Sequence, residues 1–171
     1  RYIALVGPDH PALIDVQLNR AAMLRDVGRS EEALELAERA LAMSEATTNT
    51  QFQLAALLAV ARAQSDLGRN EQAVQTFVRA RDLAVQIFPE GHVKVSRLLI
   101  GVVEQQIELG HLDAAREAVA DSRWGDGGQG HRLWGLALLA KHDGDLDEAL
   151  RQMDAALVLL AEARTEHQLR V

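Results

Sequence analysis

One short motif, repeated four times, constrains the fold of this chain more than any other feature. Each copy places a glycine five residues before an alanine. The copies are VGRSEEAL at 27–34, LGRNEQAV at 67–74, LGHLDAAR at 109–116 and DGDLDEAL at 143–150. Their glycines, Gly28, Gly68, Gly110 and Gly144, are spaced by 40, 42 and 34 residues. Small residues also recur in register, at Ala21, Ala61 and Ala137 before the glycines and at Ala40, Ala80, Ser122 and Ala156 after them.

The motif predicts two helices joined by a tight turn, four times over. Glycine ends a helix readily because it adopts a left-handed backbone without a Cβ penalty. Ser30 and Asn70 are suitable N-caps for the second helix, and Asp145 with Glu148 has the spacing of a capping box. Small residues on both helices allow a close crossing. We expect helices at about 10–27, 30–46, 50–67, 70–88, 92–109, 112–122, 131–143 and 146–166.

Charge and composition exclude several classes of partner. The formal net charge is −7, from 18 basic and 25 acidic residues, whereas nucleic-acid binding needs a basic surplus. The chain has no cysteine, and no apolar stretch approaches the roughly 20 residues that cross a bilayer. We therefore expect no nucleic acid, no membrane contact in this segment and a cytoplasmic location.

The four copies resemble the tetratricopeptide repeat (TPR), in which glycine lies at the turn between two antiparallel helices. The 34-residue step equals the usual TPR period, and the 40- and 42-residue steps are similar to the longer variant of kinesin light chains. That variant often carries a GxxHP-like linker, which GPDHP at 7–11 and, loosely, FPEGHV at 88–93 resemble. The resemblance implies an all-α fold, an α-solenoid of about four repeats wound as a right-handed superhelix.

The same resemblance implies one array over 1–171. Its expected parts are the tail of a preceding repeat at 1–9 and repeats at 10–49, 50–90, 91–128 and 129–171, the last with the C-terminal helix. The third copy departs most, because its second helix is short and is followed by WGDGGQG at 124–130. We expect looser packing around this repeat, a flexible loop at 125–130, and Trp124 holding that loop to the repeat.

Three patterns that suggest ion binding are better explained by the fold. DGDLDE at 143–148 begins like a calcium loop, but Glu148 and Asp154 stand where an EF-hand needs glycine and a bidentate glutamate. GDGGQG at 125–130 lacks the Lys-Ser/Thr of a phosphate loop. His131 and His142 share a helix face but lie about 16 Å apart, too far to share a metal ion. We expect no metal, no cofactor and no catalytic activity.

In TPR arrays the first helices of the repeats line a concave groove that binds peptides, and the resemblance carries those positions onto this chain. The expected groove residues are Asn19, Ala22, Arg25, Asp26, Leu58, Arg62, Asp66, Ile100, Glu104, Trp134, Leu138 and His142. The corresponding positions also include Ile107, Glu108, His131, Gly135 and Lys141.

Two features of these positions bear on the kind of partner. An asparagine such as Asn19 can donate to and accept from a peptide backbone, and Arg62 with Trp134 has hot-spot character. Leu18 and Ala22 replace the lysine and asparagine with which chaperone-binding TPRs clamp a C-terminal carboxylate. We therefore do not expect this chain to recognise a chaperone tail.

The sequence predicts a non-catalytic module that binds a protein or peptide segment in its groove. Two alternatives remain open: self-association as a homodimer through exposed apolar end faces, and a regulatory region of a bacterial Ser/Thr kinase or transcriptional regulator. Because the chain starts at Arg1 and its 18 basic residues include only two lysines, we expect a fragment of a larger, bacterial protein.

Overall fold

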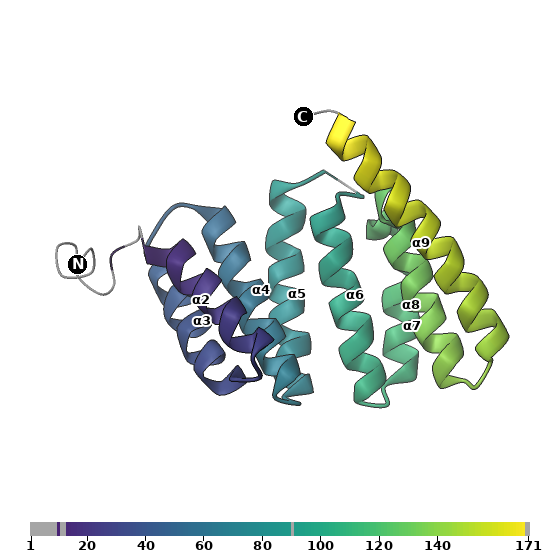
Figure 1. Ribbon diagram of the computed structural model, residues 1–171, viewed down its shortest axis with the longest axis horizontal. Helices are drawn as coiled ribbons and strands as arrows, with labels where there is room; N and C mark the ends of the chain where they lie inside the picture. Colours follow the sequence, from purple (N-terminus) through teal and green to yellow (C-terminus); the bar gives the residue numbers. More distant parts are fainter. Residues whose placement is uncertain (1–9, 11–12, 90, 170–171) are drawn as a thin grey trace. The chain divides into compact units, whose positions relative to one another are not determined.

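The computed structural model describes residues 10, 13–89 and 91–169. In this part of the chain the secondary structure consists of α-helices and two short 3₁₀ turns, with no strand, so the expected all-α class is confirmed (Figure 1). The elements are α2 (Ile14–Asp26), α3 (Ser30–Glu45), α4 (Thr50–Asp66), α5 (Asn70–Ile87), α6 (Val93–Glu108), α7 (Leu112–Ala120), η2 (Ser122–Trp124), η3 (Asp126–Gly128), α8 (Gln129–His142) and α9 (Leu146–Leu169).

The helix boundaries agree with the sequence expectation apart from small shifts at a few ends. The first described helix begins at Ile14 rather than near residue 10, and α9 continues to Leu169 rather than ending near 166. The expected repeat tail at 1–9 and most of the GPDHP segment lie outside the described residues.

The four motif glycines end their helices with one shared geometry. All four have positive φ, between 69° at Gly68 and 85° at Gly144. In each copy the residue after the glycine donates its N–H to a carbonyl five residues earlier, as Arg29 does to Leu24 at 2.8 Å. This is the long hydrogen bond of a Schellman turn. The predicted helix, turn and helix therefore form in every copy.

Helix starts are capped less uniformly than the sequence suggested. Ser30 and Asn70 are the first residues of α3 and α5 rather than caps before them, and no side chain caps α3. Asp145 does cap α9, because its Oδ1 accepts the Glu148 N–H at 3.0 Å. Asn49 and His92 cap α4 and α6 in the same way.

The first of two compact units covers residues 1–83, and its core lies where α2, α3 and α4 meet. One buried cluster consists of Ala21, Leu24, Ala33, Leu34, Ala37, Val60 and Ala63. A second consists of Leu13, Ile14, Ala40, Met43 and Ala56. Alanine makes up four of the seven residues of the first cluster and two of the five of the second. These small side chains let the helix axes approach closely, and the larger side chains fill the remaining space.

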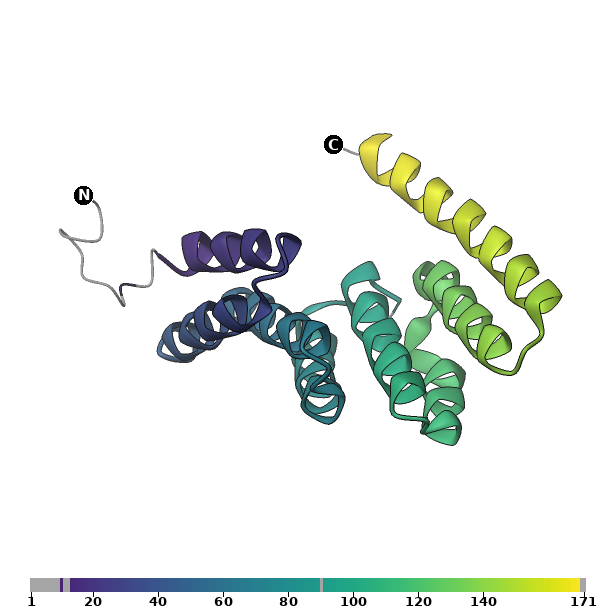
Figure 2. The same ribbon diagram turned by 60° about the horizontal axis from the view of Figure 1, so that its bottom comes forward.

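The second compact unit covers residues 84–171. In it α6 packs on α7 and α8, and α8 packs on α9. Figures 1 and 2 both show α8 beside the long α9. Residues on all sides of α6 are buried, from Val95 to Gln105. Because neighbouring elements enclose α6, its position in the second unit is fixed by packing.

The expectation of loose packing around the third repeat is wrong. Trp124 is buried, and its indole N–H donates to the Ala118 carbonyl at 2.9 Å. The residues expected to form a flexible loop instead include η3, which packs closely on its neighbours. A Cβ on Gly127 would lie 2.5 Å from the Gly91 oxygen, and one on Gly128 would lie 2.4 Å from Ser96 Oγ. The glycines thus serve close approach rather than flexibility.

Candidate partner-binding groove

A groove of about 250 Å³ lies between α6 and α8, the first helices of the third and fourth repeats. Its lining residues share one property: the repeat alignment assigned every one of them to the concave face. They are Glu104, Ile107, Glu108, Leu138, Lys141 and His142. Side chains from two separate helices therefore form one hollow at positions that the TPR resemblance assigned to the groove.

The two walls of this α6–α8 groove carry opposite charge. Glu104 and Glu108, one turn apart, come from α6, whereas Lys141 and His142 come from the last turn of α8. Positive side chains are favoured there because the carbonyl end of a helix carries partial negative charge. Ile107 and Leu138 are half-buried and supply apolar surface between the walls. Such a groove suits a segment that has an apolar side chain flanked by polar or charged groups.

Hydrogen bonds and ion pairs fix the end of α8 next to the groove. Arg116 of α7 reaches Asp143, with its Nη2 3.1 Å from both carboxylate oxygens. The Nδ1 atom of His142 lies 3.9 Å from Asp143 Oδ1. Because Asp143 directly follows α8, this contact positions the Lys141–His142 wall.

In the first unit, two of the predicted groove residues bind each other. The Arg25 guanidinium on α2 holds the Asp66 carboxylate on α4 through two bonds, Nε to Oδ2 at 2.5 Å and Nη2 to Oδ1 at 3.0 Å. This bidentate geometry is the strong form of an arginine–carboxylate pair. The pair joins successive first helices across their surface, so its first role is to link them.

The other predicted residues differ in how far they are accessible. Asn19, Ala22 and Asp26 are exposed on α2, and Leu58 and Arg62 are half-buried on α4. Trp134 is half-buried on α8. Ile100 is buried on α6 and is not among the residues that line the groove.

Gly135, one of the positions assigned to the groove, has a packing role. A Cβ at this position would lie 3.0 Å from Val119 Cγ2 and 3.6 Å from Ile100 Cδ1. The missing side chain therefore lets α8 approach both α6 and α7 closely.

His131, which the alignment also assigned to the groove, lies in the interior of the second unit. Burial, and then the positive charge of Arg97, lower the pKa of its imidazole from the usual 6.5. Its Nδ1 is buried and has no hydrogen-bond partner among the residues described. The ring lies nearly parallel to Trp134, with centroids 6.5 Å apart. A neutral imidazole inside the unit is a packing group, so we do not include it in the groove.

A second hollow, which the sequence did not reveal, lies beside the link between α5 and α6. Its volume is about 330 Å³, and its lining residues are Val85, Phe88, Pro89, Val95 and Arg123. Phe88 stacks on His92 with centroids 4.3 Å apart, and Lys94 Nζ lies 4.7 Å from the Phe88 ring centre. The FPEGHV linker was the available signal, but it indicates a connection between repeats and not a cavity.

Within the described residues, no three or more histidine, cysteine or acidic side chains gather in a way that suits a metal ion. None of the described helices has the length and apolar character needed to cross a membrane.

The chain matches no protein-family model and no curated protein, whereas several solved structures are similar to it. One is a putative kinesin light chain from Podosopora anserina with nearly identical TPR-like repeats. It is 18% identical over 90% of this chain and 77% of its own, with a TM-score of 0.67. Its Q17M variant gives a TM-score of 0.68 at the same identity and coverage. BtubC (BKLC) from P. vanneervenii is also 18% identical, over 90% of this chain and 66% of its own, with a TM-score of 0.68.

These structures show that the chain has a TPR-like helical repeat fold, as the resemblance of its four motif copies to the TPR implied. Repeats stacked in this way form extended concave surfaces. At 18% identity the likeness defines the fold, and the partner has to be inferred from the groove itself.

Proposed function

We propose that the chain binds a protein or peptide segment in the α6–α8 groove. The observation that supports this proposal is the groove's lining, which consists entirely of positions that the resemblance to TPR repeats assigns to the concave face. Both walls belong to helices of one packed unit. Little ordering of the receptor therefore opposes binding, which favours affinity.

The charges and the apolar surface of the groove define the chemistry of the segment. An aliphatic or aromatic side chain would pack on Ile107 and Leu138, and an acidic group beside it would face Lys141 and His142. A basic or amide group on the other side would face Glu108. The proposed partner is therefore an extended or helical peptide segment that carries an apolar residue next to an acidic one.

A peptide-display experiment tests this proposal with random peptides as the probe. The chain is used to select from a library of random peptides of about 12 residues, and the enriched peptides are measured by fluorescence anisotropy. Leu138→Ala removes buried contact area and should weaken binding about tenfold. Lys141→Ala should weaken the binding of acidic peptides and should flatten the dependence of their affinity on salt.

Arg151→Ala is a matched control, because it removes an exposed basic residue on α9 away from the groove lining. It should leave peptide affinity unchanged, and circular dichroism should show equal helicity for all three variants. Equal affinity of the selected peptides for wild type, Leu138→Ala and Lys141→Ala rejects the groove assignment.

The first helices of the first unit are proposed to add binding residues of their own. Asn19, exposed on α2, and Arg62, half-buried on α4, carry groups that can hydrogen-bond to a peptide backbone or an acidic side chain. Asn19→Ala and Arg62→Ala should then weaken the binding of selected peptides whose affinity does not respond to Leu138→Ala. If both variants bind every selected peptide like wild type, the binding surface is limited to the second unit.

A further inference from the structure

The last helix carries a row of exposed leucines. Leu146, Leu150 and Leu157 are separated by four and seven residues and therefore share one face of α9. Leu150 is 63% exposed. We call this row the α9 face.

The repeat register shows what the α9 face corresponds to elsewhere in the chain. Leu150 follows Gly144 by the same six residues that separate Leu34 of α3 from Gly28. Leu34 is only 3% exposed, because α4 packs on α3 and places Val60 and Ala63 in the same buried cluster. The α9 face is therefore the equivalent of the surface on which α3 receives the first helix of the next repeat.

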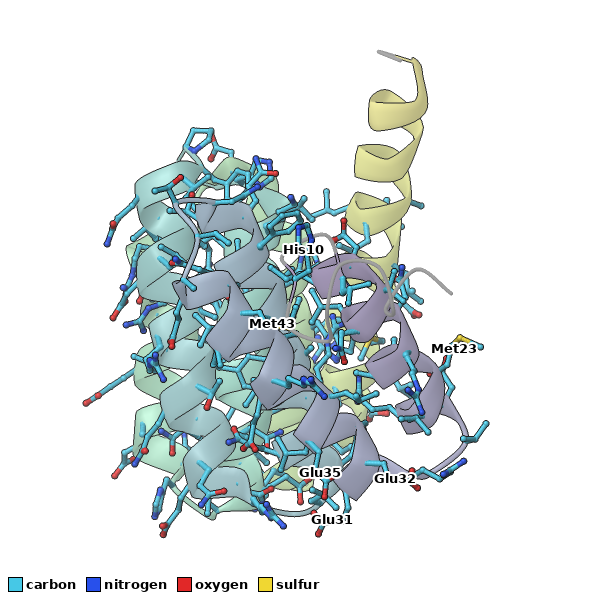
Figure 3. All side chains as sticks on the ribbon, turned by 90° about the vertical axis from the view of Figure 1, so that its left-hand side faces the viewer. His10, Met23, Glu31, Glu32, Glu35 and Met43 are labelled. Carbon is cyan, nitrogen blue, oxygen red and sulfur yellow. The ribbon has the colours of Figure 1, made fainter. Side chains whose placement is uncertain are left out.

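A complementary row lies on α2 and consists of Val16, Met23 and Val27, all exposed. Met23 is 69% exposed, and Figure 3 shows its side chain pointing away from the helices. Met23 precedes Gly28 by the same five residues that separate Ala63 from Gly68. Ala63 is fully buried. The row, which we call the α2 face, is thus the equivalent of the α4 surface that packs on α3.

We propose that the α2 face of a second copy of this chain packs on the α9 face, in the way that α4 packs on α3. The proposal goes beyond peptide binding and assigns the α2 face and the α9 face to each other. Burial of the exposed leucine, valine and methionine side chains would drive the association.

Charges at equivalent positions support this pairing and its polarity. Arg25 and Asp66 link successive first helices, and their equivalents across the proposed contact are Lys141 of one copy and Asp26 of the next. The proposed contact therefore brings a positive and a negative side chain together, as the contact between α2 and α4 does.

The second ion pair between repeats gives the same result. Arg69 binds Glu31 of the preceding repeat at 2.9 Å, and the equivalents are Arg29 of one copy and Asp147 of the other. Arg29 already binds Glu32 in its own chain. That pair is exposed, so exchanging or sharing it costs little.

A charged residue at the centre of the α2 face limits the affinity of the proposed contact. Arg20 of α2 stands where α4 has the buried Val60. The guanidinium has to reach the edge of the contact while its stem packs. Association should therefore be weaker than the packing within the chain, with a dissociation constant in the micromolar to millimolar range.

The two faces differ, so the contact is heterologous. Each copy that joins still offers one free face, and association continues beyond a pair unless a ring closes. This behaviour distinguishes the proposal from a symmetric dimer formed by two α9 faces.

Two single variants and their mixture test the proposal by sedimentation velocity. Leu150→Glu blocks the α9 face, and Met23→Glu blocks the α2 face, because a charge would be buried without a partner. Each variant alone should be monomeric at concentrations where wild type associates, with its association constant lowered at least about tenfold. An equal mixture should form a one-to-one pair and stop there, since only one compatible pair of faces remains.

The matched control is Val158→Glu, which introduces the same charge at an exposed residue of α9 outside the row. Its equivalent in α3, Ala42, stays exposed although α4 packs on that helix. Val158→Glu should therefore associate like wild type. Circular dichroism confirms that every variant is folded.

Three results would overturn the proposal. One is a wild-type mass that stays monomeric up to about 1 mM. Another is self-association of Met23→Glu, which would show that the α9 face does not need the α2 face. The third is a mixture that remains monomeric although wild type associates. None of these measurements uses a peptide, so the result is independent of the groove proposal.

Discussion

Replacing Gly128 by alanine tests whether the glycines of the 124–130 segment serve close approach. Gly128 has φ −99° and ψ −2°, a backbone conformation open to any residue. The substitution therefore introduces no backbone strain, and its effect comes from contact alone. The added Cβ would lie 2.4 Å from Ser96 Oγ and 3.3 Å from Ser96 Cβ.

Two opposing contributions set the magnitude. Overpacking of this kind costs about 1–3 kcal/mol in a well-packed core. Alanine also restricts the unfolded chain more than glycine does, which stabilises the fold by about 0.4–1 kcal/mol. We therefore expect Gly128→Ala to lower the free energy of unfolding by about 1–2 kcal/mol.

Ser96→Ala should remove most of that loss. It deletes the oxygen that the new methyl group meets, and the hydrogen bond it gives up, from Oγ to the His92 carbonyl, is long at 3.4 Å. In the Ser96→Ala background, Gly128→Ala should be close to neutral, within about 0.5 kcal/mol. Urea unfolding followed by circular dichroism of the four proteins gives the coupling energy directly.

Gly110→Ala provides the contrasting control. No atom lies within 4 Å of a Cβ placed there, but φ is +73°. Its cost of about 1–2 kcal/mol comes from the backbone alone and should be the same with serine or alanine at position 96. If Gly128→Ala costs equally much in both backgrounds, the close-approach argument is refuted.

Two further predictions concern charged groups. The Arg25–Asp66 pair, with side chains 24% and 33% exposed, should show a double-mutant coupling of about 0.5–1 kcal/mol. The coupling should shrink in about 1 M salt, and a coupling that ignores salt would contradict an ionic link. The pKa of His131 is lowered by burial and then by Arg97, so the unfolded chain binds the proton more tightly than the folded chain. The contribution of His131 to the free energy of unfolding is therefore fully present above pH 6.5 and is lost as the pH drops through its folded pKa. His131→Gln should lose less stability than wild type between about pH 7.5 and about pH 5 in urea titrations, and an equal loss would contradict this assignment.

The fold could be predicted from the sequence because the turn carries a local signal. A glycine with positive φ after an apolar run ends a helix whatever surrounds it, and four such turns in register define the repeat. The sequence could not show how the third repeat fills its core. Trp124 gains its role from a contact with Ala118, and Gly128 from one with Ser96, and helical spacing predicts neither contact. The amino-acid sequence of a glycine-rich segment is similar whether the segment is flexible or tightly packed.

Part of the groove could be proposed from the sequence, because the resemblance to TPR repeats implies which positions of each first helix face the concave side. It assigned Glu104, Leu138 and His142 to that side, and the structure brings all three to the α6–α8 groove. The resemblance does not report how deeply a residue is buried. Ile100 is buried and does not line the groove, and a Cβ on Gly135 would lie 3.6 Å from its Cδ1. Ion pairs between helices, such as Arg25 with Asp66, are also hard to predict from the sequence. They depend on how far one helix is shifted along the other, and the sequence of a single helix does not show that shift.

The Schellman turns have a consequence for how the chain folds. Each joins two helices that are neighbours in sequence, and α2 with α3, α6 with α7, and α8 with α9 pack on each other directly. Contacts of such short sequence separation need little loop closure, so any of these hairpins can act as a nucleus. A substitution in one turn should therefore redirect folding to begin at another hairpin, and the overall folding rate should change little.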